Sequence, residues 1–133
     1  MRVVLDTNIT ISALALPGGQ AEKAIIGAVE GRFELLISRT IILEVLDVLA
    51  RKFAREAEEL SRVALFLADM GEVVRPRKKI HILSDEPDNR ILECAVTGHA
   101  EVIVTGDRAM LALGIWEGVR ILGLRDFLEI VGR

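Results

Sequence analysis

Residues 1–8 read MRVVLDTN, an apolar run followed directly by three polar side chains. Residues 3–5 are typical of a buried strand, and the apolar pattern resumes at Ile9 with helical spacing. A strand that feeds a helix accounts for this change of pattern. Asp6 or Thr7 then either caps the helix or carries chemistry at the end of the strand, and this stretch alone leaves both interpretations open.

The bulk composition is that of an ordered globular protein. The chain has 133 residues, 51% of them hydrophobic and 28% charged, and we expect a single domain over residues 1–133. No apolar run reaches the roughly 18 residues that cross a bilayer and no leader precedes the first strand, so we expect a soluble cytoplasmic protein without a membrane partner. The net charge of −3 gives no overall attraction for nucleic acid, although a local basic patch can supply it.

Cysteine and histidine are too scarce for zinc or thiol chemistry. Cys94 is the only cysteine, and its apolar neighbours indicate a small core residue. His81 and His99 are the only histidines, and neither has a partner at metal-ligand spacing. Histidine-centred general-base chemistry is therefore disfavoured.

Strand-like runs and helical patterns alternate along the whole chain. The strand-like runs are residues 2–5, 33–37, 72–74, 102–105 and 119–122. The helical patterns are residues 9–14, 21–30, 41–53, 56–70, 88–97, 108–113 and 124–131. This alternation predicts an α/β fold, a three-layer α/β/α sandwich with a central, mainly parallel sheet of about five strands.

Two aspartates follow predicted strands directly. The carboxyl ends of parallel strands share one edge of a sheet, and ligands bind in the crevice there. Asp6 ends the first strand, and Asp107 follows residues 102–105 after Gly106, which permits a tight turn. We therefore expect both carboxylates at this edge.

Two further acids lie on predicted helices. Asp88 shares a helical azimuth with Leu92 and Ala95, so its side chain is expected to point inward. Glu44 lies about 40° beyond the apolar stripe of its helix, and an ion pair with Arg51 along the helix surface explains it equally well. We interpret the neighbouring acids of the Asp88 helix as solvated capping groups: Asp85 and Glu86.

Carboxylates gathered around one crevice repel each other unless a cation is bound. Oxygen ligands favour a hard divalent cation, Mg²⁺ or Mn²⁺. Such an ion activates water and neutralises charge on phosphoryl oxygens, which points to phosphate chemistry.

Four stretches in this order resemble the PIN domain family, in particular the VapC-like toxins of toxin–antitoxin systems: DTN at 6–8, Glu44, DEPDNRILECA around Asp88, and IVTGD ending at Asp107. The resemblance implies a metal-dependent endoribonuclease acting on RNA, usually a homodimer held inactive by an antitoxin protein. It also implies a catalytic and metal-binding site made of Asp6, Glu44, Asp88 and Asp107. By the same resemblance, Asn8 braces Asp6 by hydrogen bonding, and the Thr105 hydroxyl lies near the scissile phosphate or the metal-bound water.

One departure from the family pattern leaves other functions open. Many relatives carry a further aspartate where this chain has Ala109, which leaves open a single metal ion, or an inactive PIN scaffold that works through protein contacts. A Mg²⁺-binding phosphoacceptor signalling domain is a second alternative. Its adjacent acidic pair is missing at Asp6 and Thr7, and Gly123 stands where its lysine is expected.

Two basic clusters are candidates for RNA binding, because cations hold backbone phosphates without reading sequence. They are Arg51, Lys52 and Arg55, and Arg75, Arg77, Lys78 and Lys79. Solvated surface charge or contact with an acidic partner is the alternative. Aromatic residues for base stacking are few, and we interpret Trp116 as a packing or self-association residue.

Overall fold

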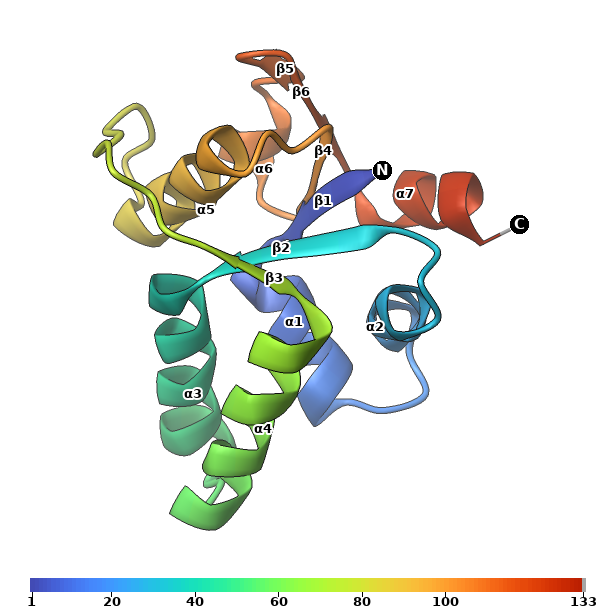
Figure 1. The fold of residues 1–133 in the computed structure, drawn as a ribbon, viewed down its shortest axis with the longest axis vertical. Coiled ribbons are helices and arrows are strands. Elements are labelled where there is room, and N and C mark those ends of the chain that lie inside the picture. The colour runs from blue at the N-terminus through green and yellow to red at the C-terminus, as the bar shows by residue number, and fades with distance from the viewer. Residues whose placement is uncertain (133) are drawn as a thin grey trace.

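The structure, a computed structural model, describes residues 1–132. Its strands are β1 (Arg2–Leu5), β2 (Glu34–Ser38), β3 (Glu72–Val74), β4 (Val102–Val104), β5 (Ile115–Trp116) and β6 (Val119–Leu122). Its helices are α1 (Thr7–Ala15), α2 (Gln20–Val29), α3 (Arg39–Phe53), α4 (Ala57–Met70), α5 (Glu86–Thr97), α6 (Arg108–Leu111) and α7 (Leu124–Val131). Figure 1 shows their arrangement.

The strands form one sheet in the order β3-β2-β1-β4-β6-β5. All neighbouring strands run parallel except β5 and β6, which pair antiparallel. The turn between these two has positive φ at Glu117 (52°) and Gly118 (79°), the backbone that a two-residue hairpin requires. The α/β prediction is confirmed, with six strands in the described chain where about five were expected.

Helices cover both faces of the sheet. Alternate residues of a strand point to opposite faces, so Val3 and Leu5 pack with α2 and α7, where the rings of Phe33 and Phe127 meet edge to face at 5.1 Å. Val4 points the other way, into a core completed by α3, α5 and α6. Cys94 is buried in that second core, as predicted.

Strand register brings the loops of the candidate site together. β1 pairs with β4 so that Leu5 lies opposite Val104, and the Asp6 backbone N–H donates to the Val104 carbonyl at 2.9 Å. The residues that follow both strands therefore meet at one edge of the sheet.

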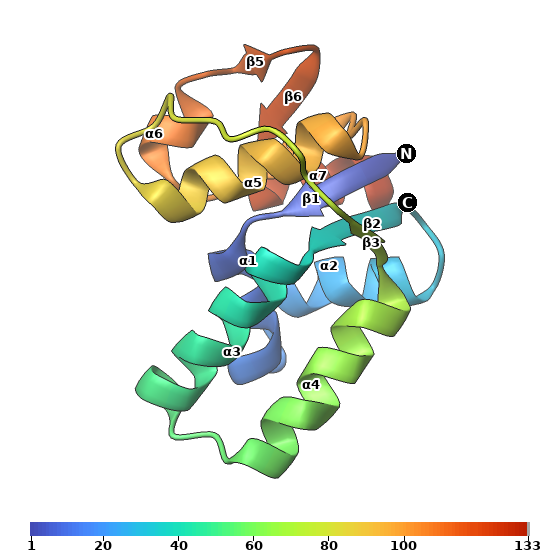
Figure 2. The same cartoon turned by 60° about the vertical axis from the view of Figure 1, so that its left-hand side comes forward.

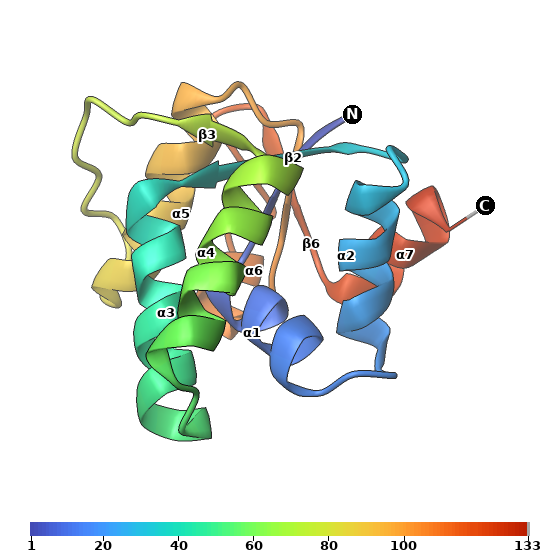
Figure 3. The ribbon, with the colours of Figure 1, turned by 60° about the horizontal axis from the view of Figure 1, so that its bottom comes forward.

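Helix α3 starts at the same edge, directly after β2. The Ser38 hydroxyl caps it by accepting from the Ile41 N–H at 3.2 Å. Figures 2 and 3 show α3 and α4 packed side by side and extending away from the sheet. Among the described helices, none combines the length and the apolar character needed to cross a membrane.

Candidate active site

Asp6 occupies the position before α1, but its side chain makes no capping hydrogen bond in the described chain. Its carboxylate is 4% exposed, and Oδ2 accepts a hydrogen bond from the Thr105 hydroxyl at 2.6 Å. Burial raises the pKa of Asp6, although the Thr105 hydroxyl and nearby backbone N–H groups oppose that shift. Those N–H groups belong to the first turn of α1, so the Asp6 carboxylate interacts with the helix start while it remains available for chemistry at the strand end.

Thr105 links the two strand-end aspartates. Its hydroxyl donates to Asp6 and accepts from the Asp107 backbone N–H at 3.0 Å. The residue is fully buried, and its predicted place near the scissile phosphate or a metal-bound water stays a prediction. Its hydrogen-bonding capacity is used inside the protein, where it fixes Asp6 relative to Asp107.

Asp107 caps α6. Its Oδ2 accepts from the Met110 backbone N–H at 2.9 Å, and the side chain is only half-buried. One carboxylate oxygen thus orients the residue while the other remains available at the mouth of the site.

Asp88 sits on the first turn of α5, where Pro87 suits a position whose N–H has no helical partner. Its side chain points inward, as predicted, and is 7% exposed. The pKa of Asp88 is raised to about 7. Burial is the largest cause, and the charges of Asp6, Asp107, Asp85 and Glu44 add to it, in that order.

Glu44 is half-buried on α3 and belongs to the same electrostatic cluster. Burial raises its pKa most, and the charge of Asp6 raises it further. Its predicted alternative partner, Arg51, instead pairs with Asp47 at 2.9 Å. A surface ion pair between Glu44 and Arg51 is therefore wrong.

Asp85 is the acid that sequence reasoning missed. It precedes α5 without a capping hydrogen bond from its side chain within residues 1–132, and its charge raises the pKa of both Glu44 and Asp88. Its place three residues before Asp88, at a helix start, was the available signal. Glu86 does not cap either, because it accepts from His81 and pairs with Arg90.

An open cleft of about 490 Å³ lies over the strand ends. It is lined by Asp6, Asn8, Ile9, Ser12, Gly106, Asp107 and Arg108. The exposed Asn8 side chain makes no hydrogen bond with any described residue, and it is the backbone N–H of Asn8 that supports Asp6. Glu44 and Asp88 are outside the lining but within electrostatic reach of it.

The donors fit a hard cation in chemistry, since they are carboxylates, and their mutual repulsion adds to the effect of burial in raising the pKa of Asp88. No three His, Cys, Asp or Glu side chains in the described part of the chain are grouped closely enough to hold an ion. Joint ligation therefore requires the carboxylates to draw together by side-chain rotation.

The two basic clusters differ in availability. Arg51 and Arg55 are engaged by Asp47 and Glu59, each at 2.9 Å, and Lys52 is exposed beside them. The other four are exposed and form no ion pair with any residue of the described range: Arg75, Arg77, Lys78 and Lys79. Trp116 is half-buried and packs against the second core, as a packing residue does.

Replacing Thr105 with valine tests its bridging role. The change keeps the shape but leaves the Asp6 carboxylate and the Asp107 N–H without their buried partner, so we expect a loss of about 1–3 kcal/mol in the free energy of unfolding. Urea unfolding at pH 7 measures it. Thr105→Ser keeps the hydroxyl and serves as the control, with a loss of about 1 kcal/mol for the missing methyl group. Equal stabilities of the valine variant and the parent would contradict the bridge.

Comparisons with known proteins agree with this architecture. The chain is 26% identical over 117 residues to protein MJ1680 of Methanocaldococcus jannaschii, covering 85% of this chain and 75% of that protein. It superposes with a TM-score of 0.65 on a chain of VapBC2 from Rickettsia felis, a structure solved with a bound DNA fragment from the VapBC2 promoter. The two chains are 14% identical, and the match covers 92% of this chain and 98% of that one.

VapBC-1 from nontypeable Haemophilus influenzae gives the same TM-score of 0.65 at 18% identity, covering 94% of this chain and 99% of that chain. At these identities the likeness concerns the fold. The family model described as PIN domain matches residues 2–109, which include strands β1 to β4 and the acids described above. This chain belongs to the PIN domain family.

Proposed function

We propose that this PIN domain is a Mg²⁺- or Mn²⁺-dependent endoribonuclease that hydrolyses RNA phosphodiester bonds, and the toxin of a toxin–antitoxin pair. The observation that carries the proposal is the electrostatic coupling of acids from four separate segments: burial is the main reason why the pKa of Asp88 is raised to about 7, and the charges of the other acids raise it further. A carboxyl group with a strongly raised pKa, among other acids beside a strand-end cleft, is typical of functional sites.

Asp6, Glu44, Asp88 and Asp107 would hold the ion. When bound, the ion would activate water and neutralise charge on the phosphate. Thr105 keeps Asp6 at a fixed distance from Asp107, and α6 orients Asp107 through Met110. Two of the four carboxylates, those of Asp6 and Asp107, are thus oriented by hydrogen bonds inside the protein.

Partners follow from the same proposal. The structural neighbours come from VapBC complexes, which supports an antitoxin partner for this chain. We propose that it acts in the cytoplasm and forms a homodimer. An inactive PIN scaffold is the competing function, favoured by Ala109 and by the absence of a closed group of three ligands within residues 1–132.

The test is cleavage of a fluorescent single-stranded RNA by the purified protein. We expect cleavage in Mn²⁺ and none after chelation with EDTA. Calorimetric titration with Mn²⁺ separates the alternatives, because an inert scaffold has no need to bind the ion. A stable adduct after incubation with acetyl phosphate would instead favour a phosphoacceptor domain.

A further inference from the structure

A segment without helix or strand joins β3 to α5 and runs along that helix. We call residues 75–85 the strap. Its beginning lies by the end of α5, where Arg77 and Lys78 border a cavity of about 240 Å³ together with Val96 and Thr97. Its end lies by the start of α5, at Asp85. The strap therefore runs antiparallel to the helix.

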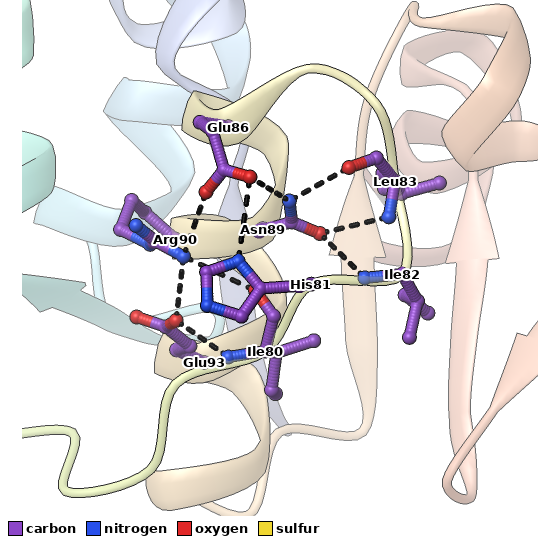
Figure 4. A network of polar contacts seen from close by, with 8 residues as sticks. All are labelled: Ile80, His81, Ile82, Leu83, Glu86, Asn89, Arg90 and Glu93. Atoms are coloured by element: carbon purple, nitrogen blue, oxygen red, sulfur yellow. Dashed lines mark hydrogen bonds and ion pairs between the residues drawn. The ribbon is translucent and has the colours of Figure 1, made fainter.

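Asn89 holds the end of the strap. Its Oδ1 accepts from the backbone N–H groups of Ile82 at 3.2 Å and Leu83 at 2.9 Å, and its Nδ2 donates to the Leu83 carbonyl at 2.8 Å. Figure 4 shows these contacts converging on one amide. Asn89 is fully buried, and its side chain satisfies backbone groups that no secondary structure would otherwise pair.

Glu93, one turn further along, holds the middle of the strap. Its Oε2 accepts from the Ile80 backbone N–H at 2.9 Å and pairs with Arg90 at 2.8 Å. Arg90 in turn donates to the Ile80 carbonyl at 3.1 Å. Glu93 is 4% exposed, so a buried carboxylate holds the strap through the contacts drawn in Figure 4.

The contacts fix a register between the strap and α5. Asn89, Glu93 and Val96 recur at helical spacing and form one face of the helix, whereas Asp88, adjacent to Asn89, points to the acidic cluster. The same helix therefore carries an acid of the candidate site at one end and the basic part of the strap at the other. Thr97 lies nine positions after Asp88, a rise of about 13.5 Å along the helix, which a few nucleotides of a single strand span.

We propose that Asn89 and Glu93 are positioning residues that hold the strap in register, so that its exposed cations bind backbone phosphates of the RNA cut at the acidic cleft. The inference rests on the proposed function, because it takes RNA as the substrate. Arg75, Arg77, Lys78 and Lys79 are exposed and unpaired among the described residues, as phosphate-binding cations are. A single RNA strand would contact both the acidic cleft and the strap cations, since both interact with the phosphate backbone.

Binding of a single-stranded RNA by fluorescence anisotropy, over a range of salt concentrations, tests the proposal. The Asp6→Asn variant is used throughout, so that cleavage does not interfere. Adding the triple change Arg77→Ala, Lys78→Ala and Lys79→Ala should weaken binding at least about tenfold. It should also reduce the slope of log affinity against log salt by about 2, as loss of three contacts with single-stranded phosphates predicts. Arg125→Ala, an exposed cation on α7, is the control and should change neither quantity.

Asn89→Ala should weaken binding in the same direction, with faster amide exchange at Ile82 and Leu83. The triple change should then add little in the Asn89→Ala background, because both variants act on the same surface. Glu93→Gln is the milder second variant, since it keeps an acceptor for the Ile80 N–H but removes the charge that pairs with Arg90. A purely structural role would lower the melting temperature and leave the salt slope unchanged, which would overturn the proposal.

The outcomes separate this inference from the nuclease proposal. If the parent cleaves RNA and the strap changes leave its affinity unaltered, the inference fails and the nuclease stands. If no RNA is cut in Mn²⁺ but binding depends on the strap and on Asn89 as described, the RNA-binding role of the strap stands and the nuclease fails. Strap-dependent binding of polyglutamate with no binding of RNA would assign the surface to an acidic protein and overturn the inference.

Discussion

Asp6→Asn is expected to lower the rate of RNA cleavage in Mn²⁺ at least about a thousandfold, a loss of about 4 kcal/mol in transition-state stabilisation. Asparagine keeps the shape of the side chain and still accepts from the Thr105 hydroxyl, so the fold is preserved. What it removes is a buried negative charge at the centre of the electrostatic cluster, because Asp6 contributes to the raised pKa of both Glu44 and Asp88. Initial rates on a fluorescent RNA, with circular dichroism of the variant, measure both expectations.

Asp126→Asn is the matched control for this prediction. Asp126 is an exposed aspartate in the first turn of α7, on an element that packs against the opposite face of the sheet from α5. Its replacement removes the same charge from the molecule and should leave the rate within about twofold of the parent. If the Asp6→Asn variant cleaves RNA at the rate of the parent, the carboxylate cluster takes no part in the mechanism.

Much of the fold could be predicted because the buried strands are short apolar runs bounded by polar residues. The predicted ranges 2–5, 72–74 and 119–122 coincide with β1, β3 and β6. β5 was missed because two residues, Ile115 and Trp116, carry no periodicity. Its pairing depends on a turn whose first residue is Glu117, and glutamate gives no signal for positive φ.

The parts of the candidate site that follow strand ends could be predicted from the sequence. The parts that depend on how β1 and β4 are aligned could not. Asp6 and Asp107 follow strands, so their common edge follows from topology alone. The bridging role of Thr105 was not predicted, because only the register of β1 against β4 sets its hydroxyl between Asp6 and Asp107. The structure adds Asp85: its place three residues before Asp88 was a local signal, but its effect on Glu44 depends on the tertiary packing of α3 against the start of α5.

Asp88→Asn is expected to stabilise the metal-free protein while weakening Mn²⁺ binding at least about a hundredfold. The pKa of Asp88 in the folded protein is about 7, against an ordinary value of 3.8. Below that ordinary value both folded and unfolded chains hold the proton, so the group costs nothing. As the pH rises from about 4 to about 7, the unfolded chain loses its proton first, and the folded state loses stability relative to it.

Above pH 7 this destabilisation of the parent reaches its full, constant size. Because water screens the partly exposed carboxylates around Asp88, we expect about 1–2 kcal/mol, or about 3–6 °C in melting temperature, at pH 8. The asparagine variant should therefore melt above the parent at pH 8 and close to it at pH 4 when both are free of metal. Differential scanning calorimetry in EDTA measures the difference, with Asp126→Asn as the control.

Saturating Mn²⁺ should reverse that order at pH 8. An ion that binds only the folded parent stabilises it in proportion to the logarithm of its concentration over the dissociation constant, whereas the variant has lost a ligand and gains much less. The Asp88 carboxylate would therefore destabilise the metal-free protein and stabilise the metal-bound protein. If the variant melts below the parent in EDTA at pH 8, the Asp88 carboxylate does not destabilise the metal-free protein. If Mn²⁺ raises the melting temperature of the variant as much as that of the parent, Asp88 is not a metal ligand.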